Sequence, residues 1–376
     1  MGHWPYTISA VALLVVVLLV TGWWRLAFSL FALRPDRMTV KQLALAVSAP
    51  ADVERVDTIL GSFAGGFNAM IVAPSSSGWQ HYCDSLPVLY RPFAHEGAAM
   101  GYTLRNLFHY RSGDFEERLV KRRPEFRYLY YVGLGFWSGQ RNHSADRLSR
   151  IVNGLDPLHG YLCYDGYGFK HAFFDYPKEP RRLRQLNTLN GYARNAAYQG
   201  VGRAFFFLFM ARPDLLVEHI RRLGEFAVDA AAGVGLAAVF VNPDRLDEAR
   251  QLGMKLPSEW HDHFHLGMCF GLKARAINDW DQFERDISPL DPRIREAVYS
   301  SIRECDRVEL IVRGEHNADG YRHWRERVTQ WMVDNIEYPL FGIKSSATTL
   351  PGEPRACARA DTQPEQQAAA RADVRG

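Results

Sequence analysis

The alternation of apolar and polar positions divides the chain into three parts. An uncharged apolar run occupies residues 7–24, and aromatic-rich stretches then alternate with charged amphipathic segments as far as about residue 343. The remainder is rich in Ala, Arg, Gln, Pro and Thr. These patterns predict a membrane anchor in residues 1–34, a helical domain in residues 35–343 and a disordered tail in residues 344–376.

The first run is 18 residues long, close to the roughly 20 residues that span a bilayer core. Residues 1–6 contain no Lys or Arg, and the Gly-Trp-Trp-Arg sequence that follows is a poor cleavage site, which argues against a signal peptide. The flanking cations all follow the run, and they are Arg25, Arg34, Arg37 and Lys41. We therefore expect a single-pass membrane protein with a cytoplasmic folded domain, and residues 26–33 along the interface.

Within the folded part, glycines recur in apolar stretches at steps of 32 to 36 residues. They are Gly65, Gly97, Gly133, Gly166, Gly200, Gly233 and Gly267. A steady period of this size is typical of stacked supersecondary units. Glycine weakens a helix by about 1 kcal/mol relative to alanine, so it indicates places where another helix comes close. We predict inner helices packed at these glycines, with seven short buried strands as the alternative.

Charged segments between the glycine stretches carry helix-start signals. Asp114, Ser144, Asp214, the Asn242-Pro243-Asp244 sequence and Asp279 each precede an amphipathic run. The fold class is thus all-α, with about seven helix pairs that form an open superhelix or a closed α/α toroid behind the anchor. Residues 309–312 (ELIV) break the pattern and predict a short strand, and residues 321–336 predict a final amphipathic helix.

Composition narrows the functional classes. Hydrophobic residues make up 47% of the chain, enough for a large core. The 45 basic and 42 acidic residues are interspersed, so no basic stripe for nucleic acid is expected. The 5 cysteines contain no CxxC pair, which predicts buried reduced thiols.

One predicted helix face combines aromatic and polar residues. With each glycine at position zero, positions −4, −1, +3 and +6 share a face. Its polar members are Glu96, Asp165, Gln199, Arg203, Asp229, His263 and Lys273. Because buried charges are costly unless paired, this face predicts either internal salt bridges or the lining of a largely apolar pocket.

Asp165 is the first choice for chemistry, since a carboxyl group among aromatic residues has a raised pKa and can act as a general acid. Glu96 and His171 are the other catalytic candidates. The substrate-binding candidates are Tyr164, Tyr167, Phe169, Gln199, Arg203, Asp229 and Lys273. His261 and His265 have metal-ligand spacing but no evident third ligand, and nucleotide and hydrolase signatures are missing, so no metal or cofactor is expected.

The blocks EGAAMG, YYVGLGF, DGYGF and QGVGR resemble a bacterial domain-of-unknown-function family found beside enediyne polyketide synthases. The resemblance covers roughly residues 25–336. It implies a hydrophobic substrate such as a long conjugated polyene, and polyketide or other biosynthetic enzymes as partners. It implies no catalytic residue.

Three functions follow as hypotheses. The first is a membrane-anchored enzyme or accessory protein of secondary metabolism that acts on a long apolar polyene. The second is a metal-independent cyclase that protonates an isoprenoid, with aromatic faces stabilising the cation. The third is a non-catalytic helical scaffold for a biosynthetic complex.

Overall fold

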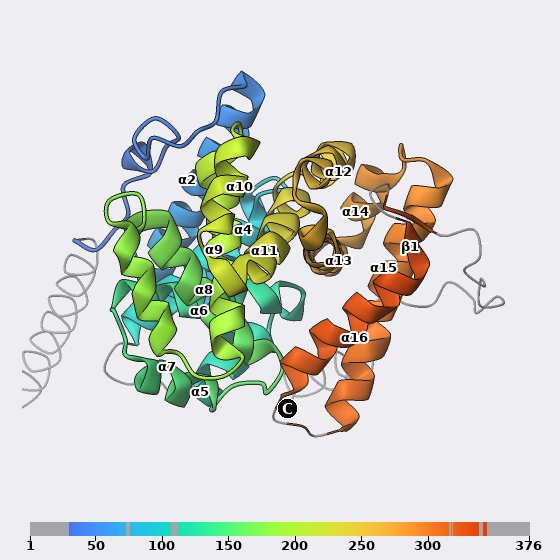
Figure 1. Cartoon of the computed structure of the whole chain (residues 1–376). Helices are drawn as coiled ribbons and strands as arrows, with labels where there is room; N and C mark the ends of the chain where they lie inside the picture. The colour runs from blue at the N-terminus through green and yellow to red at the C-terminus, as the bar shows by residue number, and fades with distance from the viewer. Residues whose placement is uncertain are drawn as a thin grey trace, which may run out of the picture.

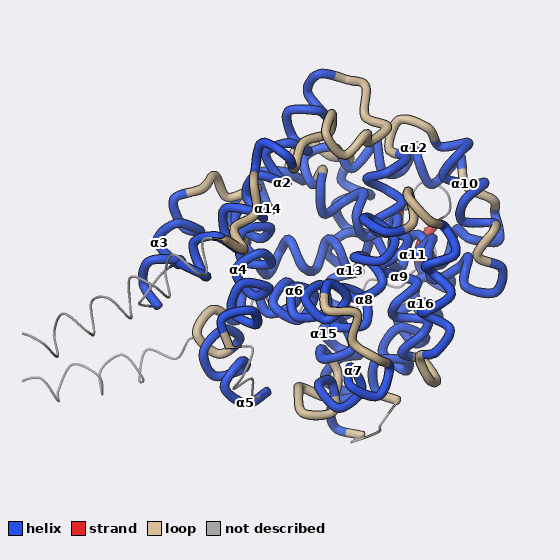
Figure 2. Tube along the Cα trace, turned by 90° about the vertical axis from the view of Figure 1, so that its left-hand side faces the viewer, coloured by secondary structure: helices blue, strands red, loops and turns tan. Residues whose placement is uncertain are grey.

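The computed structural model describes residues 30–72, 76–106, 112–315, 317, 319–337 and 341–343. They are almost entirely helical, as Figure 2 shows, so the all-α prediction is confirmed. The strands β1 (Ile336–Glu337) and β2 (Gly342–Ile343) form one short antiparallel pair, and the alternative of seven buried strands is wrong. The predicted transmembrane run and the predicted tail lie outside the described residues.

Seven of the described helices pack one after another in sequence order. They are α2 (Pro50–Val72), α4 (Arg91–Arg105), α6 (Arg127–Gln140), α8 (Leu162–Lys170), α9 (Ala193–Phe209), α11 (Ala227–Val241) and α13 (His261–Asn278). We call these the inner helices. Figure 1 shows them at the centre of the molecule.

Another short helical element follows each inner helix in sequence, and most of these elements pack against an inner helix. They are α3 (Ser76–Ser85), α5 (Ser112–Phe115) with the π-turn η2 (Glu116–Val120), α7 (Ala145–Val152), η6 (Pro180–Thr188), α10 (Pro213–Arg221), α12 (Leu246–Lys255) and α14 (Trp280–Ile287). Two of the start signals are observed as caps: Ser144 Oγ accepts a hydrogen bond from the Arg147 amide, and Asp279 accepts one from the Gln282 amide.

The inner helices touch backbone to backbone at their glycines. A methyl group on Gly200 would overlap the carbonyl oxygen of Asp165 on α8, and one on Gly202 would overlap that of Ala230 on α11. The two glycines of one helix therefore face the preceding and the following helix. Pairs with the same two-sided contacts are Gly133 and Gly135, Gly166 and Gly168, and Gly233 and Gly235. Side chains are thus excluded from these seams, which fixes the distance between neighbouring helices.

The stretch Gly224–Val241 is the one described helical segment that is long and apolar enough to cross a membrane. Because 78% of this segment is buried inside the protein, it is a core helix. The described cysteines, Cys83, Cys163, Cys269 and Cys305, are buried free thiols, as predicted.

Residues 309–312 do not form the predicted strand. They belong to α15 (Pro292–Gly314), whose buried residues Val298, Ile302, Cys305, Val308 and Val312 recur at helical spacing. The local ELIV pattern was misleading because Leu310 and Ile311 are exposed, with 73% and 39% of their surface accessible. The final amphipathic helix is confirmed as α16 (Gly320–Asn335).

The row of inner helices curves, so that the segment around α2 and α4 meets the segment around α11 and α13. Arg55 on α2 forms an ion pair with Asp244, which follows α11, at 2.6 Å, and Arg245 pairs with Asp52 at 2.7 Å. The guanidinium of Arg275 on α13 donates a hydrogen bond to the Leu89 carbonyl, just before α4, at 3.0 Å. These contacts join segments more than 180 residues apart in sequence.

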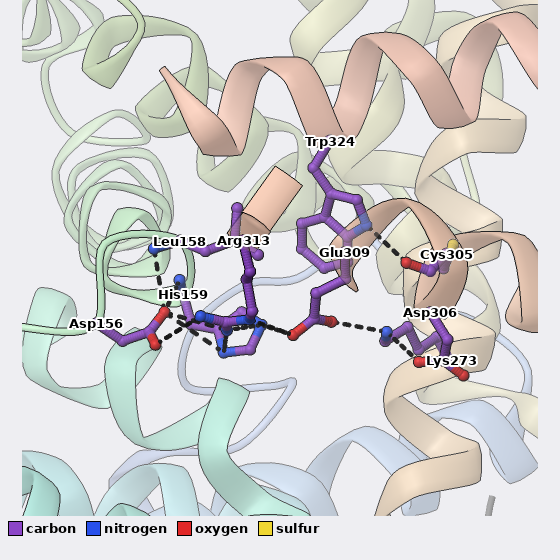
Figure 3. Close-up of polar contacts among 9 residues, drawn as sticks. All are labelled: Asp156, Leu158, His159, Lys273, Cys305, Asp306, Glu309, Arg313 and Trp324. Carbon is purple, nitrogen blue, oxygen red and sulfur yellow. Dashed lines mark hydrogen bonds and ion pairs between the residues drawn. The ribbon is translucent and has the colours of Figure 1, made fainter. Parts of the chain in front are cut away.

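A row of charged side chains fixes α15 to the inner helices (Figure 3). The buried Lys273 ammonium on α13 pairs with Asp306 and, at 2.9 Å, with Glu309 on α15. The other carboxylate oxygen of Glu309 lies 3.1 Å from His159 Nε2 in the turn η4 (His159–Tyr161). Helix α15 packs in turn against α16, which is side by side with it in Figure 1. We call the row of Lys273, Asp306, Glu309 and His159 the clamp.

We expect Gly200→Ala to lower the free energy of unfolding by about 3 kcal/mol, the upper end of the usual cost of overpacking, because the new methyl group overlaps the backbone carbonyl of Asp165. Chemical denaturation of the full chain measures this. Gly61→Ala on α2 is the matched control: nothing lies within 4 Å of its new methyl group. That variant should be unchanged or up to about 1 kcal/mol more stable. Equal effects of the two changes would contradict packing at the glycine seams.

We expect Lys273→Met to cost about 3–5 kcal/mol of stability, since it leaves carboxylates of the clamp without their buried cation. Lys121→Met removes an ion pair in which both side chains are more than 60% exposed, and should change stability by about 0.5 kcal/mol or less. A Lys273→Met protein as stable as the Lys121→Met control would show that the clamp does not hold α15.

Candidate active site

Two apolar pockets lie along the inner helices. The central pocket has a volume of about 590 Å³. It is lined by Tyr128, Leu129, Val132, Leu162, Asp165, Gln199, Arg203, Leu236, Phe240, Phe270, Ala274, Tyr321 and Trp324. The aromatic pocket has a volume of about 480 Å³. It is lined by Met38, Ile59, Leu60, Phe63, Phe93, Glu96, Phe136, Phe169, Phe173, Phe174, Arg203 and Phe207. Arg203 lines both pockets and therefore stands between them.

The glycine seams place the polar residues of these pockets. Glu96, Asp165 and Gln199 each directly precede a seam glycine, and Gly133, Gly200 and Gly233 contact their respective carbonyl oxygens. Arg203 lies one turn after Gln199 on the same face of α9. The face predicted from the sequence thus brings Glu96, Asp165, Gln199 and Arg203 together at the pockets.

Asp165 is fully occupied by donors. The Arg203 guanidinium forms a short ion pair with Asp165 Oδ1, and the Gln199 amide donates to Oδ2 at 2.8 Å. Asp165 is 1% exposed. Both of its carboxylate oxygens are therefore engaged, one by a cation and the other by an amide. This geometry does not support the general-acid role predicted for Asp165, and it makes Asp165 the anchor of Arg203.

Glu96 differs from Asp165 in that no cation among the described residues lies within hydrogen-bonding distance of it. It is 4% exposed, and its ion-pair partner, Arg203 Nη2, lies 3.9 Å from Glu96 Oε1, beyond hydrogen-bonding distance. Burial raises the pKa of Glu96 to about 7, with Arg203 opposing the rise and Asp165 adding to it. A substantial fraction of Glu96 is therefore protonated at neutral pH. Of the two predicted acids, Glu96 is the one that the structure supports.

Phenylalanine rings surround Glu96 in the aromatic pocket. The ring centres of Phe63 and Phe136 are 5.2 Å apart, those of Phe136 and Phe174 are 5.8 Å apart, and Phe169 stacks on Phe173 at 5.3 Å. The Arg203 guanidinium lies 5.1 Å above the Phe169 ring. Such ring faces attract cations, so the pocket can accommodate an apolar chain and stabilise positive charge on it.

Helix α16 contributes residues that the sequence reasoning missed. Arg325, which is 2% exposed, bonds to the Gln199 amide oxygen and pairs with Asp229 at 3.2 Å. Tyr321 and Trp324 from the same helix line the central pocket. The available signal was an arginine on the apolar stripe of the predicted helix, at one-turn spacing from Tyr321 and Val328.

Other predicted site residues lie away from the pockets. His171 bonds to Asp175 at 2.7 Å, and its pKa is lowered to about 4 by burial. The Tyr167 hydroxyl donates to the His143 carbonyl, and Tyr164 packs edge-on against Tyr161. The structure therefore groups these three residues on the opposite side of α8. Asp229 lies beyond Gln199, bound by Arg325 and by Asn195 at 2.8 Å, and Lys273 belongs to the clamp.

His261 and His265, the possible metal pair, each bond to a backbone carbonyl. His261 Nε2 donates to Leu256 and His265 Nδ1 donates to His261, at 3.0 and 2.8 Å. Their ring centres are 6.4 Å apart, and no group of three or more His, Cys, Asp or Glu residues suited to a metal ion occurs in the described part of the chain.

The fold and site define an all-α protein with two apolar pockets joined at a buried charged network. Residues 23–332 match the family model described as "Protein of unknown function (DUF1702)", and the chain belongs to this family. The expectation of a domain-of-unknown-function family is thus confirmed, and the link to enediyne biosynthesis stays a prediction. No curated protein and no solved structure matches the chain.

The raised pKa of Glu96 predicts a pH-dependent stability. Because the folded-state pKa of about 7 exceeds the ordinary 4.5, ionisation penalises the folded state as pH rises between these values. We expect Glu96→Gln to gain up to about 3 kcal/mol relative to wild type between about pH 4 and about pH 8, as measured by denaturation at each pH. Glu259→Gln, at an exposed position, is the control. A pH-independent difference for Glu96→Gln would show that Glu96 is ionised throughout.

Proposed function

We propose that the protein is a membrane-anchored enzyme of secondary metabolism that binds a long apolar polyene and isomerises or cyclises it by proton transfer from Glu96. The observation that carries this proposal is a buried carboxyl group, with Arg203 no closer than 3.9 Å, in a pocket walled by phenylalanine rings. Burial raises the pKa of this group to about 7. A polyketide pathway of the enediyne type is the context we infer from the motif resemblance, with other enzymes of that pathway as partners. The site on the folded domain is then cytoplasmic, as the flanking cations predict.

We also infer that the inner helices and their connectors are tandem repeats of one unit, curled towards an α/α ring. The near-constant glycine period and the identical two-sided glycine contacts support this inference. The ion pairs between α2 and the segment after α11 support curvature into a ring. A single transmembrane helix in residues 7–24 completes the proposed architecture.

The proposed step balances without a cofactor. Glu96 gives its proton to a terminal carbon of the conjugated system, so that a C–H bond forms and the O–H bond breaks. The chain becomes a delocalised carbocation over the phenylalanine faces, and the new Glu96 carboxylate is stabilised by Arg203 at 3.9 Å. Loss of a proton from another carbon returns the proton to Glu96 and leaves an isomer of unchanged composition. A ring forms when a second double bond of the chain first attacks the cationic carbon: its π electrons become the new C–C bond, its far carbon becomes the cation, and proton loss next to that carbon restores a double bond and Glu96.

Cyclisation of an isoprenoid is the second candidate, because the same acid and the same aromatic wall suit it. Of the two substrates, the conjugated polyene is easier for Glu96 to protonate. A cation spread over several double bonds is easier to form than one on an isolated alkene, and a carboxyl group with a pKa of about 7 is a mild acid. The Tyr128 hydroxyl at the central pocket, buried and without a hydrogen-bond partner among the described residues, could bind a polar end of either substrate.

Proton transfer to carbon can be followed with deuterium. The full chain in lipid nanodiscs is incubated in D₂O with a linear conjugated polyene hydrocarbon or with squalene, and carbon-bound deuterium is measured by mass spectrometry. We expect incorporation into the polyene, reduced by a factor of about 10² or more in Glu96→Gln. Glu259→Gln should retain the wild-type rate.

The outcomes separate the candidate functions. Incorporation into squalene alone would favour the isoprenoid cyclase. If neither substrate gains deuterium, and if Glu96→Gln leaves the metabolite profile of the producing cell unchanged while deletion of the gene alters it, the protein is a scaffold and the proposed chemistry is wrong.

A further inference from the structure

The segment of residues 30–47, which we call the strap, runs antiparallel to α2. The Leu33 amide donates to Asn68 Oδ1, and the Asn68 side chain donates back to the Leu33 carbonyl, both at 2.8 Å. Seven residues later, the Val40 amide donates to Asp57 at 2.6 Å. The strap therefore begins near the C-terminal end of α2, where Val72 lies, and proceeds towards the N-terminal end of α2.

The outer side of the strap is both apolar and cationic. Leu30 and Phe31 are 82% and 59% exposed, and Val72 at the adjacent end of α2 is 39% exposed. Arg34, Arg37 and Lys41 are also exposed, and no ion pair joins any of them to another described residue. Asp36 is the single acidic residue of the strap. Exposed large apolar residues beside unpaired cations are typical of a surface that contacts an anionic bilayer.

The inner side of the strap closes the aromatic pocket. Met38 lines that pocket together with Phe63 and Glu96. Leu33 and Met38 also pack on the apolar cluster that contains Phe63 and Phe136. One thin segment thus separates the pocket that holds Glu96 from the apolar and cationic outer surface.

We propose that the strap rests on the anionic leaflet of the membrane and that an apolar substrate passes from the bilayer, beside Met38, directly into the aromatic pocket. This proposal rests on the proposed function, of which it names the source of the substrate. Residues 7–24, the apolar run, end only six residues before Leu30, so the strap lies at the membrane surface if that run is inserted. Each cation near the surface contributes about 1 kcal/mol of attraction to anionic lipid. The route keeps a water-insoluble chain out of water.

The first test measures contact with the bilayer. In the full chain carrying Cys357→Ser, an environment-sensitive fluorophore is attached at Leu30→Cys, and the protein is placed in nanodiscs with phosphatidylserine and spin-labelled quencher lipid. Leu310→Cys is the matched control, since Leu310 is 73% exposed and belongs to α15, a helix that lies on the other side of the molecule from the N-terminal segment in Figure 1. We expect severalfold stronger quenching at position 30. Equal quenching at the two positions would overturn the proposal.

The second test measures uptake. Diphenylhexatriene serves as the apolar polyene probe, and its transfer from the nanodisc is followed through energy transfer from tryptophan. Charge reversal of Arg34, Arg37 and Lys41 to Glu should slow uptake severalfold from anionic nanodiscs and not from neutral ones. Charge reversal of the exposed Arg182, Arg222 and Arg327 is the control. Equal slowing by the two sets, or unchanged uptake with the strap reversed, would overturn the proposal.

The failures of the two proposals are distinguishable. If wild-type protein binds the probe and transfers deuterium but position 30 is not quenched, the strap proposal is wrong and the proposed function stands. If position 30 is quenched as expected but the Glu96→Gln change does not affect deuterium transfer, the function is wrong and the membrane contact stands.

Discussion

The contact of one helix backbone with the next at the glycines is the constraint on which the rest of the structure depends. Since Gly200 leaves no room for a side chain between α8 and α9, the residues that flank it must leave the seam. The residues just before Gly97, Gly166 and Gly200, which are Glu96, Asp165 and Gln199, are carried to the pocket side. Where that position is apolar, as in Val132, the pocket wall is apolar. The seam therefore determines both the helix spacing and the polarity of the pockets.

Charge balance explains why one carboxyl group of the buried network differs from the others. Glu96, Asp165 and Asp229 share two guanidinium groups, those of Arg203 and Arg325. There are two cations for three carboxyl groups. Ionisation is least favourable for the carboxyl group that lies farthest from a cation. Asp165 and Asp229 each accept a hydrogen bond from a guanidinium and another from an amide, and Glu96 does not. Its protonation is thus a property of the whole network.

The sequence predicted the helices and most of the polar face, and the places where prediction failed have physical causes. Residue Asp165 was located correctly because glycine spacing gives the register of α8. His171 was not located correctly, because it lies six residues after Asp165 and the helix turns by about 100° per residue, so the two side chains leave α8 on different faces. Lys273 was predicted to bind substrate, but it pairs with acidic residues of α15, because α15 covers that part of α13. Arg325 could not be placed at the site, since it comes from α16, 126 residues after Gln199.

The position of Glu96 in the fold matters for its chemistry. The aromatic pocket is built by the strap, α2, α4, α6, α8 and α9, whereas the central pocket lies further along the chain and is covered by α16. In the proposed route, a chain enters beside Met38 into the pocket that Glu96 and Arg203 also line. The Arg203–Asp165 pair divides the two pockets, so a chain long enough to fill both must pass it, with its leading end among Tyr128, Tyr321 and Trp324. The acid then faces the trailing part of the chain, on the side from which the chain entered. In the proposed reaction, the phenylalanine wall keeps water away from the carbocation until a proton has returned to Glu96.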